Sequence, residues 1–273
     1  MKLRDKVAIV TGTSPNIGGG IAEGLAAEGA ALVCIDARPE NAADCARYIN
    51  GTGGKAIGIT CDVCDDKQVA AAVDEACKAF GRVDVLVNNA AFFNKKGVLN
   101  MPLDEWQKQI GVILTGAFLF TKHAAQSMIE RKVKGTVINI VSTAGHQGEP
   151  GNVAYSTAKS GLLNFTRSVA MELAVHGIRV NSLTPTATDP SESDERDARW
   201  GRAVVAASPE RRAAFDIYRR RVPMQKLPRP SDYGRAAAFL ASEEASMMTG
   251  TDLRIDAGAV GRYWAWDPSA QGA

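Results

Sequence analysis

The side chains best suited to chemistry are a serine, a tyrosine and a lysine at fixed spacings. Lys159 follows Tyr155 by four residues, and Ser142 precedes the tyrosine by thirteen. On a helix, residues four apart lie on one face, so the phenol and the ammonium would be neighbours. We expect the positive charge to lower the tyrosine pKa from its ordinary value of about 10. Such a tyrosine can exchange a proton with an alcohol or a carbonyl group.

A glycine-rich turn near the start of the chain favours this catalytic interpretation over a chance pair on a helix surface. Residues 11–18, Thr-Gly-Thr-Ser-Pro-Asn-Ile-Gly, follow the apolar run 7–10 and precede the amphipathic run 21–28. A strand, a glycine-rich turn and a helix in this order bind a pyrophosphate through backbone N–H groups and the helix N-terminus. The predicted cofactor contacts in this turn are Gly12, Ser14, Asn16, Ile17 and Gly18.

A second apolar run, 31–35, ends in an acidic residue that indicates which dinucleotide binds. Asp36 follows Gly18 by eighteen residues, a position from which a carboxylate accepts hydrogen bonds from the adenosine ribose. The same carboxylate would repel a 2′-phosphate, and Ala37 offers no compensating charge. Arg38 is close enough to keep NADP as the alternative, but we expect NAD as the cofactor.

Composition and charge fit a globular protein and exclude several other classes. The 273 residues are 45% apolar and 23% charged, with a net charge of +2, as in ordinary globular domains. The sequence has no basic run with interleaved aromatic residues, so we expect no nucleic-acid partner. It has neither an apolar run of the roughly 20 residues that span a bilayer nor a signal-peptide core. We therefore expect a cytoplasmic protein with no membrane partner.

The cysteines indicate neither a disulfide framework nor a metal site. Their number, five, is odd, and Cys61 and Cys64 form a single C-x-x-C pair. A zinc site needs a second pair of ligands at a suitable spacing, and the sequence has none. A redox pair would need a thioredoxin-like context, which is missing. We therefore expect reduced cysteines and no bound metal.

Apolar runs typical of buried strands alternate with helical patterns along most of the chain. The expected strands are residues 7–11, 31–35, 55–60, 84–88, 135–141, 178–184 and 252–256. The expected helices are residues 18–29, 40–50, 66–80, 103–131, 153–176 and 231–241. This alternation predicts an α/β fold, a Rossmann-type doubly wound parallel sheet of seven strands with helices on both faces. Without a repeat or a linker, residues 1–273 should form a single domain.

Two segments depart from this alternation. Residues 186–230 hold five prolines and many charges of both signs, and the runs 194–202 and 209–218 could each form a helix. Because long insertions in compact domains often cover binding sites, we expect a substrate lid, with a solvated excursion as the alternative. The C-terminal tail, 259–273, carries Trp264 and Trp266, which we expect to pack on another subunit or on the lid.

Taken together, the motifs resemble those of the short-chain dehydrogenase/reductase family, in its shorter single-domain branch, over nearly the whole chain. Besides the glycine-rich turn and the Ser-Tyr-Lys spacing, residues 88–91 (Asn-Asn-Ala-Ala) resemble the family's N-N-A-G. Residues 179–185 resemble its R-V-N-x-x-x-P segment. Residues 246–250 and 255–258 resemble its closing S-x-x-T-G and V-D-G-G segments.

The resemblance implies an oxidoreductase that transfers a hydride between NAD(H) and a secondary alcohol or ketone. Tyr155 would be the acid/base, Lys159 would lower its pKa and bind the nicotinamide ribose, and Ser142 would hydrogen-bond the substrate oxygen. Members often pair two long helices, here 103–131 and 153–176, so we expect a homotetramer or, failing that, a dimer. The further cofactor contacts that the resemblance implies are Asp62, Val63, Asn89, Ala90, Pro185, Ala187 and Thr188.

The small-molecule substrate should lie between the catalytic residues and the lid. Phe93 and Asn94 follow the fourth strand, while Ala144 and Gln147 follow the catalytic serine. An aromatic wall with a few polar groups is common in small-molecule sites. We expect His146, in the same loop, to contact substrate or solvent rather than act as the acid/base.

Four positions differ from the family pattern. Asn16, Ala91 and Thr186 replace glycines, and Ile113 replaces an asparagine that holds a water in the family's proton relay. Asparagine tolerates left-handed backbone angles, so the turn should survive. Two alternatives stay open. One is a cofactor-binding regulator that has lost turnover, to which Asn16 and Ile113 give some weight, and the other is an epimerase or dehydratase that retains its NAD.

Ile113 gives a direct test of the relay. Its side chain cannot hold a water, so either another polar group or a backbone carbonyl anchors the water, or proton exchange is slower. We predict an active enzyme with a modified relay, in which Ile113→Asn raises the rate of the proton-transfer step. Single-turnover rates in light and heavy water would measure that step. An unchanged rate in the variant would show that the relay is not limiting.

Overall fold

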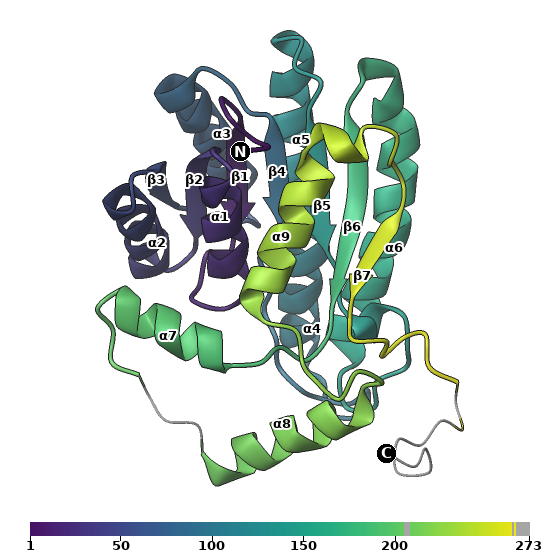
Figure 1. Ribbon diagram of the computed structural model, residues 1–273. Coiled ribbons are helices and arrows are strands. Elements are labelled where there is room, and N and C mark those ends of the chain that lie inside the picture. Colours follow the sequence, from purple (N-terminus) through teal and green to yellow (C-terminus); the bar gives the residue numbers. More distant parts are fainter. Residues whose placement is uncertain (205–207, 264, 266–273) are drawn as a thin grey trace.

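Seven parallel strands form one sheet in the order β3-β2-β1-β4-β5-β6-β7 in the computed structural model, which describes residues 1–204, 208–263 and 265 (Figure 1). This confirms the predicted Rossmann-type sheet. The strands are β1 (Val7–Thr11), β2 (Ala31–Asp36), β3 (Lys55–Thr60), β4 (Val85–Asn88), β5 (Thr136–Ile140), β6 (Arg179–Pro185) and β7 (Asp252–Ile255).

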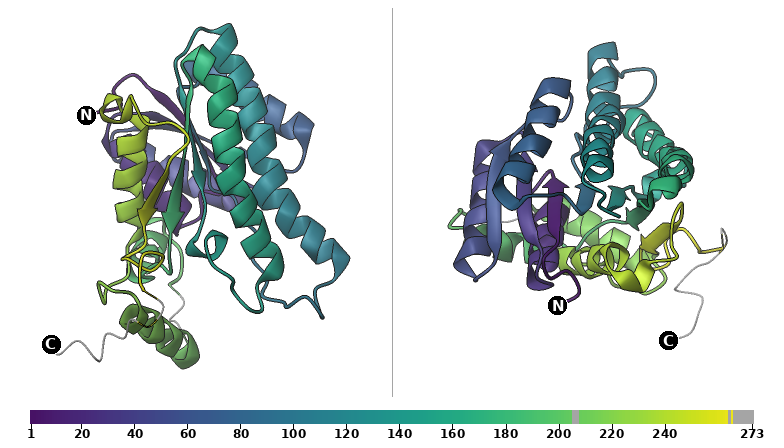
Figure 2. Two further views of the ribbon diagram at one scale, coloured as in Figure 1. Left: turned by 90° about the vertical axis from the view of Figure 1, so that its right-hand side faces the viewer. Right: turned by 90° about the horizontal axis from the view of Figure 1, so that it is seen from above.

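Helices cover both faces of the sheet, as the view from above shows (Figure 2). One apolar core lies under α1, α2 and α9, and a second lies under α3, α5 and α6. The helices are α1 (Ile17–Ala27), α2 (Pro39–Gly51), α3 (Asp66–Phe80), α4 (Leu103–Ile110), α5 (Gly116–Glu130), α6 (Val153–Leu173), α7 (Ser191–Arg199), α8 (Pro209–Arg221) and α9 (Pro230–Ala241).

The central strands are buried and mainly apolar because they are covered on both sides. Every residue of β1 is buried, and so is every residue of β5. Successive side chains of a strand point to opposite faces. Ala8 and Val10 accordingly join the core under α1 and α9, while Val7 and Ile9 join the core under α3 and α5. Continuous apolar runs of this kind are typical of parallel sheets.

The order in which strands are added to the sheet switches sides between β1 and β4. Strands β2 and β3 lie on one side of β1, whereas β4 to β7 lie on the other. Ligands of open α/β sheets bind at the carboxyl ends of the strands beside such a switch. Asn89, just after β4, bridges this point by donating from Nδ2 to the carbonyls of Thr11 (3.0 Å) and Gly12 (2.8 Å).

Helix α1 is held on the sheet by unusually close contact with α9. A Cβ atom built on Gly24 would lie 2.8 Å from the Gly234 Cα atom, and one built on Gly20 would lie 2.5 Å from the Pro230 Cβ atom. Side chains at these positions would push the two helices apart. The helix that follows the glycine-rich turn therefore depends on a helix formed near the end of the chain.

The helix expected over 103–131 is interrupted. Residues 111–115 form a π-helical turn between α4 and α5, and Ile113 lies inside it with 2% of its surface exposed. Such turns are rare and often occur at functional sites. Ile113 packs with Val141, Ala158 and Leu162 beside Tyr155, so this position faces the α6 helix that carries the predicted catalytic residues.

The two helices expected within 186–230 form as α7 and α8. Helix α7 lies near α1 and α2, whereas α8 extends below the carboxyl ends of the strands (Figure 1). Trp264 and Trp266 of the tail lie outside the described residues. Among the described residues, no helix is long and apolar enough to cross a bilayer.

Candidate active site

The structure brings together the three residues predicted to be catalytic. Ser142 follows β5, and its Oγ caps the next turn by accepting from the Ala144 N–H at 3.2 Å. Tyr155 and Lys159 lie one turn apart near the start of α6. The phenol hydrogen-bonds the Ser142 hydroxyl, and the lysine Nζ lies 5.6 Å from the centre of the tyrosine ring.

Lys159 is buried with a single strong acceptor. Its side chain is 2% exposed, and its Nζ donates to the Ile140 carbonyl at 2.6 Å. Burial disfavours the charged form and lowers the pKa of this lysine to about 7. An amine with such a pKa gains and loses a proton readily at neutral pH.

The predicted direction of the Tyr155 pKa shift is wrong for the protein without a ligand. Burial raises the pKa of Tyr155, the hydrogen bond from Ser142 partly opposes this, and the Glu149 carboxylate adds to it. The reason is that desolvation of the phenolate outweighs any help from Lys159, which is itself desolvated and bound to a carbonyl. The phenol is therefore held in its protonated form.

The glycine-rich turn has the shape needed for a pyrophosphate. Gly12 has a φ of +71°, and a Cβ atom on Gly18 would lie 2.0 Å from the Gly12 carbonyl oxygen. Asn16 begins α1 without a side-chain capping bond, so the first amides of the helix are not capped by that residue. Its φ of −84° shows that the asparagine does not use a left-handed conformation, contrary to the expectation. The turn fits a dinucleotide cofactor.

A cavity of about 830 Å³, here called the cofactor cavity, opens at this turn. The predicted contacts that line it are Gly12, Ser14, Asn16, Ile17, Gly18, Asp36, Asp62 and Asn89. The lining residues that were not predicted as cofactor contacts are Ala37, Arg38, Asn41, Cys64, Ala91, Phe92, Lys108 and Val112. Tyr155 and Lys159, which were also predicted to contact the cofactor, do not line this cavity. The other predicted contacts outside this lining are Val63, Ala90, Pro185, Ala187 and Thr188.

These five residues contact protein groups instead. Val63 lies against Gly116, and the Ala90 N–H donates to the Thr11 hydroxyl. Ala187 packs on the apolar cluster beneath α8, the Thr188 hydroxyl contacts the Tyr233 hydroxyl at 3.2 Å, and Pro185 is buried at the end of β6. Their role as cofactor contacts stays a prediction.

Asp36 faces the cofactor cavity at the end of β2. Its Oδ1 accepts from the Arg38 N–H at 2.9 Å, and the Asn41 side chain also hydrogen-bonds it. Burial raises the pKa of this carboxyl, while these hydrogen bonds and the Arg38 charge oppose the shift. A carboxylate fixed in this way is suited to accept hydrogen bonds from ribose hydroxyls.

The four predicted substrate residues differ in what they contact. Phe93 packs edge-on against the tyrosine ring with 5.0 Å between ring centres, and 52% of its surface is exposed. Asn94 donates to the Glu105 carboxylate, and Gln147 donates to the Ala259 carbonyl at 3.3 Å. Ala144 is buried beside Ser142. Phe93 is thus a predicted substrate residue that both contacts Tyr155 and keeps surface free to meet a substrate.

His146 was expected to contact substrate or solvent, but its ring is bound within the protein. The Nε2 atom lies 3.0 Å from the Thr184 hydroxyl and 3.3 Å from an Asp252 oxygen. Asp252 also accepts from Thr184 and from Ser182, the latter at 2.6 Å. The histidine therefore ties the loop after Ser142 to strands β6 and β7.

Several residues near the site carried no sequence signal. Lys108 lies over the Phe92 ring, 4.5 Å from its centre, at the wall of the cofactor cavity. Glu105 binds both Asn94 and Lys96, so it orders the segment that positions Phe93. These residues lie in α4 and in the preceding loop, and no spacing rule links them to the catalytic motif.

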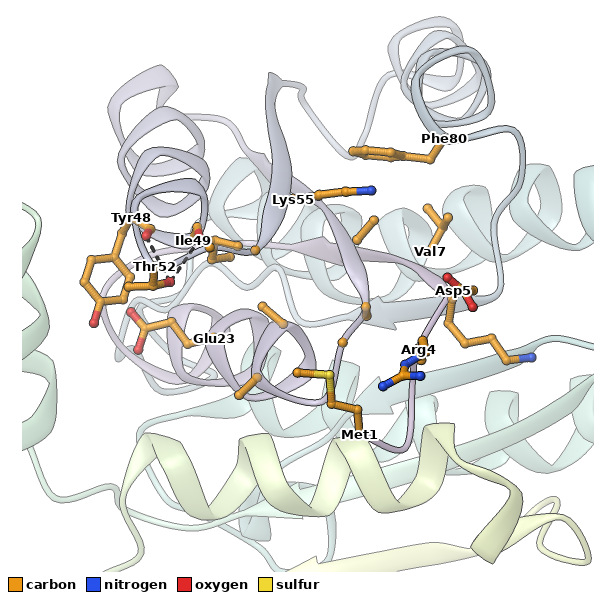
Figure 3. Close-up of a pocket in the computed structure, with 18 residues that line it drawn as sticks. Met1, Arg4, Asp5, Val7, Glu23, Tyr48, Ile49, Thr52, Lys55 and Phe80 are labelled. Carbon is orange, nitrogen blue, oxygen red and sulfur yellow. Dashed lines mark hydrogen bonds between the residues drawn. The ribbon is translucent and has the colours of Figure 1, made fainter.

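A second large cavity lies at the opposite end of the sheet. Its volume is about 790 Å³, and Figure 3 shows Arg4, Lys55 and Phe80 among the side chains around it. None of the predicted site residues lines it. It is adjacent to the amino ends of β1 and β3, where parallel sheets do not bind their ligands. The cofactor cavity is therefore the better candidate for the site.

The cysteines and acidic residues show no metal centre. The described residues contain no group of three or more His, Cys, Asp or Glu side chains placed to hold a metal ion. All five cysteines are free. Burial raises the pKa of both Cys61 and Cys64 to about 11, which disfavours the thiolate needed for redox or metal chemistry.

Comparisons with known proteins agree with this geometry. The family model described as enoyl-(acyl carrier protein) reductase matches residues 12–260. Glucose 1-dehydrogenase 2 of Bacillus subtilis (strain 168) is 37% identical over 94% of this chain and 95% of its own length. The chain belongs to the short-chain dehydrogenase/reductase family. It is therefore a member of a family of oxidoreductases that use a nicotinamide cofactor.

Solved structures of other members of the family superpose along nearly the whole chain. A short-chain type dehydrogenase/reductase from Mycobacterium marinum has a TM-score of 0.81 and 31% identity, over 94% of this chain and 96% of that one. An NAD⁺-bound xylitol dehydrogenase has a TM-score of 0.83 and 31% identity, over 93% of this chain and 99% of that one. The cis-4-hydroxycyclohexanecarboxylate dehydrogenase of Sinomonas cyclohexanicum is 37% identical over 93% of this chain and 96% of its own length.

The buried lysine predicts a specific dependence of stability on pH. Folding lowers the Lys159 pKa from 10.5 to about 7, so the unfolded chain holds this proton more tightly than the folded chain. The resulting penalty is fully present below pH 7 and disappears as the pH rises through 10.5. Lys159→Met should therefore stabilise the protein without its cofactor most at low pH.

Denaturant unfolding of the wild type and Lys159→Met, at about pH 6, 8 and 10, would measure this effect. The difference in free energy of unfolding should shrink steadily over the series. Lys78→Met, which removes an exposed lysine of α3, is the matched control and should show no such trend. A constant difference between wild type and Lys159→Met would contradict the prediction.

Proposed function

We propose that this protein transfers a hydride between NAD(H) and a secondary alcohol or ketone, with Tyr155 as the acid/base. One observation carries the proposal. Tyr155, hydrogen-bonded to Ser142 and close to Lys159, is linked to the cofactor cavity through two adjacent phenylalanines. Phe92 lines that cavity, and the next residue, Phe93, contacts Tyr155. A substrate on Tyr155 would therefore meet a dinucleotide in the cavity.

The chain's own groups have distinct tasks in this reaction. Tyr155 is partly buried, and its phenol, with its raised pKa, would donate a proton to a carbonyl oxygen during reduction. Ser142, already hydrogen-bonded to the phenol, would share the negative charge that develops on the substrate oxygen. Lys159 would return a proton to the phenol, because its own pKa is about 7. The nicotinamide, when bound, supplies or accepts the hydride.

We propose NAD as the preferred cofactor. The position of Asp36 at the wall of the cofactor cavity supports this preference, since its carboxylate would repel a 2′-phosphate. Arg38 also lines the cavity, and its charge partly offsets that carboxylate, which keeps NADP as the alternative. The NAD⁺-bound state of the xylitol dehydrogenase structure is in keeping with this choice.

The remaining proposals concern the surroundings of the site. We propose that α8 and its flanking residues cover a small-molecule substrate, because Phe215 packs on Val222 beneath the carboxyl ends of the strands. A homotetramer, or a dimer, in the cytoplasm is also proposed. Exposed apolar side chains on α5 and α6, such as Phe118 and Met171, support pairing of these helices between subunits.

Replacement of the tyrosine tests the catalytic assignment. Tyr155→Phe should lower kcat by roughly 10²- to 10⁴-fold, the usual contribution of a general acid/base. Because the ring and its packing remain, dinucleotide binding should be retained. A panel of secondary alcohols and ketones with NAD(H), followed at the nicotinamide absorbance, would measure turnover, and calorimetry would measure binding.

Tyr48→Phe, on α2 and outside the site, is the matched control and should keep full activity. A protein that binds a dinucleotide but shows no turnover with any substrate, before and after Tyr155→Phe, would be a regulator rather than an enzyme. Turnover without net change of free NAD would indicate an epimerase or dehydratase.

Replacement of the acidic residue tests the cofactor preference. Asp36→Asn should weaken NAD binding by roughly tenfold or more, because a hydrogen bond to a charged group contributes about 1.5–3 kcal/mol. The same change removes the repulsion of a 2′-phosphate, so the affinity for NADP should rise. Titration of both cofactors against both proteins would measure the ratio. A wild type that binds NADP as tightly as NAD would refute the preference.

A further inference from the structure

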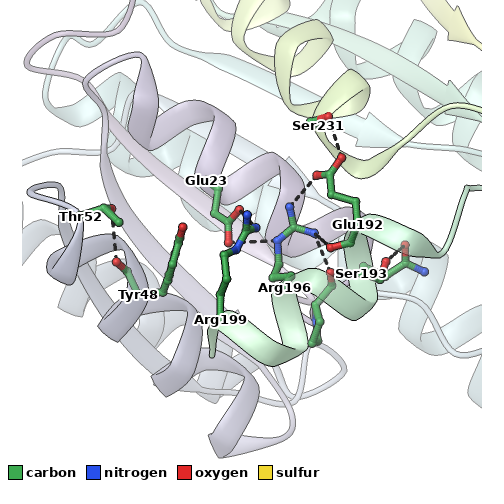
Figure 4. Close-up of polar contacts among 10 residues, drawn as sticks. Glu23, Tyr48, Thr52, Glu192, Ser193, Arg196, Arg199 and Ser231 are labelled. Atoms are coloured by element: carbon green, nitrogen blue, oxygen red, sulfur yellow. Dashed lines mark hydrogen bonds and ion pairs between the residues drawn. The ribbon is translucent and has the colours of Figure 1, made fainter. Parts of the chain in front are cut away.

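Helix α7 is fastened to the glycine-rich turn by a buried arginine (Figure 4). The Arg196 side chain is 1% exposed, and its Nη1 donates to the Pro15 carbonyl at 2.8 Å, within the turn itself. Its Nε lies 3.0 Å from the Glu23 carboxylate of α1, and its Nη2 lies 2.8 Å from Glu192. Glu192 in turn accepts from Ser231 of α9 at 2.8 Å. One guanidinium thus joins α7, α1 and the turn.

Two further contacts fit α7 to the same turn. The Ser193 hydroxyl donates to the Asn16 side chain at 3.2 Å. A Cβ atom on Gly19 would lie 2.8 Å from the Arg196 Cδ and 3.2 Å from the buried Trp200 ring. The glycine therefore makes room for the arginine. Asn16, where the family pattern has glycine, serves here as a partner for α7.

The residues after α7 reach the other side of the cofactor cavity. Arg202 donates from Nη1 to the Asn41 side chain at 2.8 Å and pairs through Nε with Asp44 at 2.7 Å. Asn41 lines the cavity and hydrogen-bonds Asp36, the proposed ribose ligand. The Trp200 carbonyl also accepts from Arg47 of α2 at 2.6 Å. The segment 191–202 therefore supports both the phosphate turn and the ribose carboxylate.

We propose that Arg196 and Arg202 are positioning residues that make α7 part of the dinucleotide site. Docked α7 holds the Pro15 carbonyl and the Asn41 side chain in the positions that suit the cofactor. Docking of α7 and binding of the dinucleotide therefore strengthen each other. This inference rests on the proposed function, since it requires a dinucleotide in the cofactor cavity.

The burial of its charge makes Arg196, rather than its neighbours, the main residue that holds α7 against the glycine-rich turn. Arg196 is enclosed and faces two carboxylates, so its removal would leave buried negative charge without compensation. Arg199 pairs with the same Glu23 at 3.1 Å, but its side chain is 40% exposed and contacts neither the turn nor Asn41. Exposed ion pairs of this kind contribute little. The two arginines therefore form a matched pair for experiment.

Coupling between two binding events is reciprocal, which gives two independent readouts. Arg196→Met should weaken NAD binding by roughly 5- to 150-fold, the usual range for such coupling. NAD should also slow hydrogen exchange of the α7 amides in the wild type, and this protection should be lost in the variant. Calorimetry measures the first effect, and exchange followed by mass spectrometry measures the second.

Arg202 is less buried than Arg196, so Arg202→Met tests the same proposal with less risk to folding. It should also weaken NAD binding, and it replaces Arg196→Met as the test if that variant does not fold. Arg199→Met removes an equal charge from the same helix and should leave both readouts as in the wild type. Two results would overturn this inference while leaving the proposed function intact. One is an unchanged NAD affinity in Arg202→Met, and the other is hydrogen exchange of the α7 amides that does not respond to NAD in the wild type. A wild type that binds no dinucleotide would instead overturn the proposed function.

Discussion

The enclosure of Lys159 against the end of β5 is the interaction on which the site depends. An amine that donates to the Ile140 carbonyl and has no access to water titrates near neutrality, and it lies one turn from a phenol that is also desolvated. This arrangement requires α6 to lie close on the sheet, with the apolar cluster around Ile113 filling the other side. The pKa of Lys159 near neutrality therefore depends on the packing around the amine as much as on its being a lysine.

The two halves of the sheet meet at the proposed cofactor site, and neither half forms it alone. Gly12 and Gly18 come from the first crossover, Asn89 joins the turn to β4, and Asp36 lies at the end of β2. The segment after β6 then supports the same place from outside, through the Pro15 carbonyl. The residues of the proposed cofactor site thus come from parts of the chain that are distant in sequence but adjacent at one edge of the sheet.

Much of the fold could be predicted from the sequence, because strands covered on both faces are mainly apolar and the glycine-rich turn has a steric requirement at Gly12 and Gly18. The placement of Tyr155 beside Lys159 followed from helix periodicity. The raised tyrosine pKa could not be predicted, because desolvation depends on what covers the ring. The π-helical turn around Ile113 and the burial of Arg196 also depend on tertiary packing. Arg196 lies in a segment rich in charged residues, so nothing in the sequence distinguishes it from an exposed arginine.

The close contact between α1 and α9 has a consequence for how the protein is made. The glycines of α1 face Gly234 and Pro230, which are synthesised more than two hundred residues after the first strand. A growing chain on the ribosome therefore presents its nucleotide-binding turn on a helix whose inner surface is still uncovered. Domains of this kind fold as units rather than strand by strand. The nascent protein should stay unable to capture its coenzyme until translation is nearly complete.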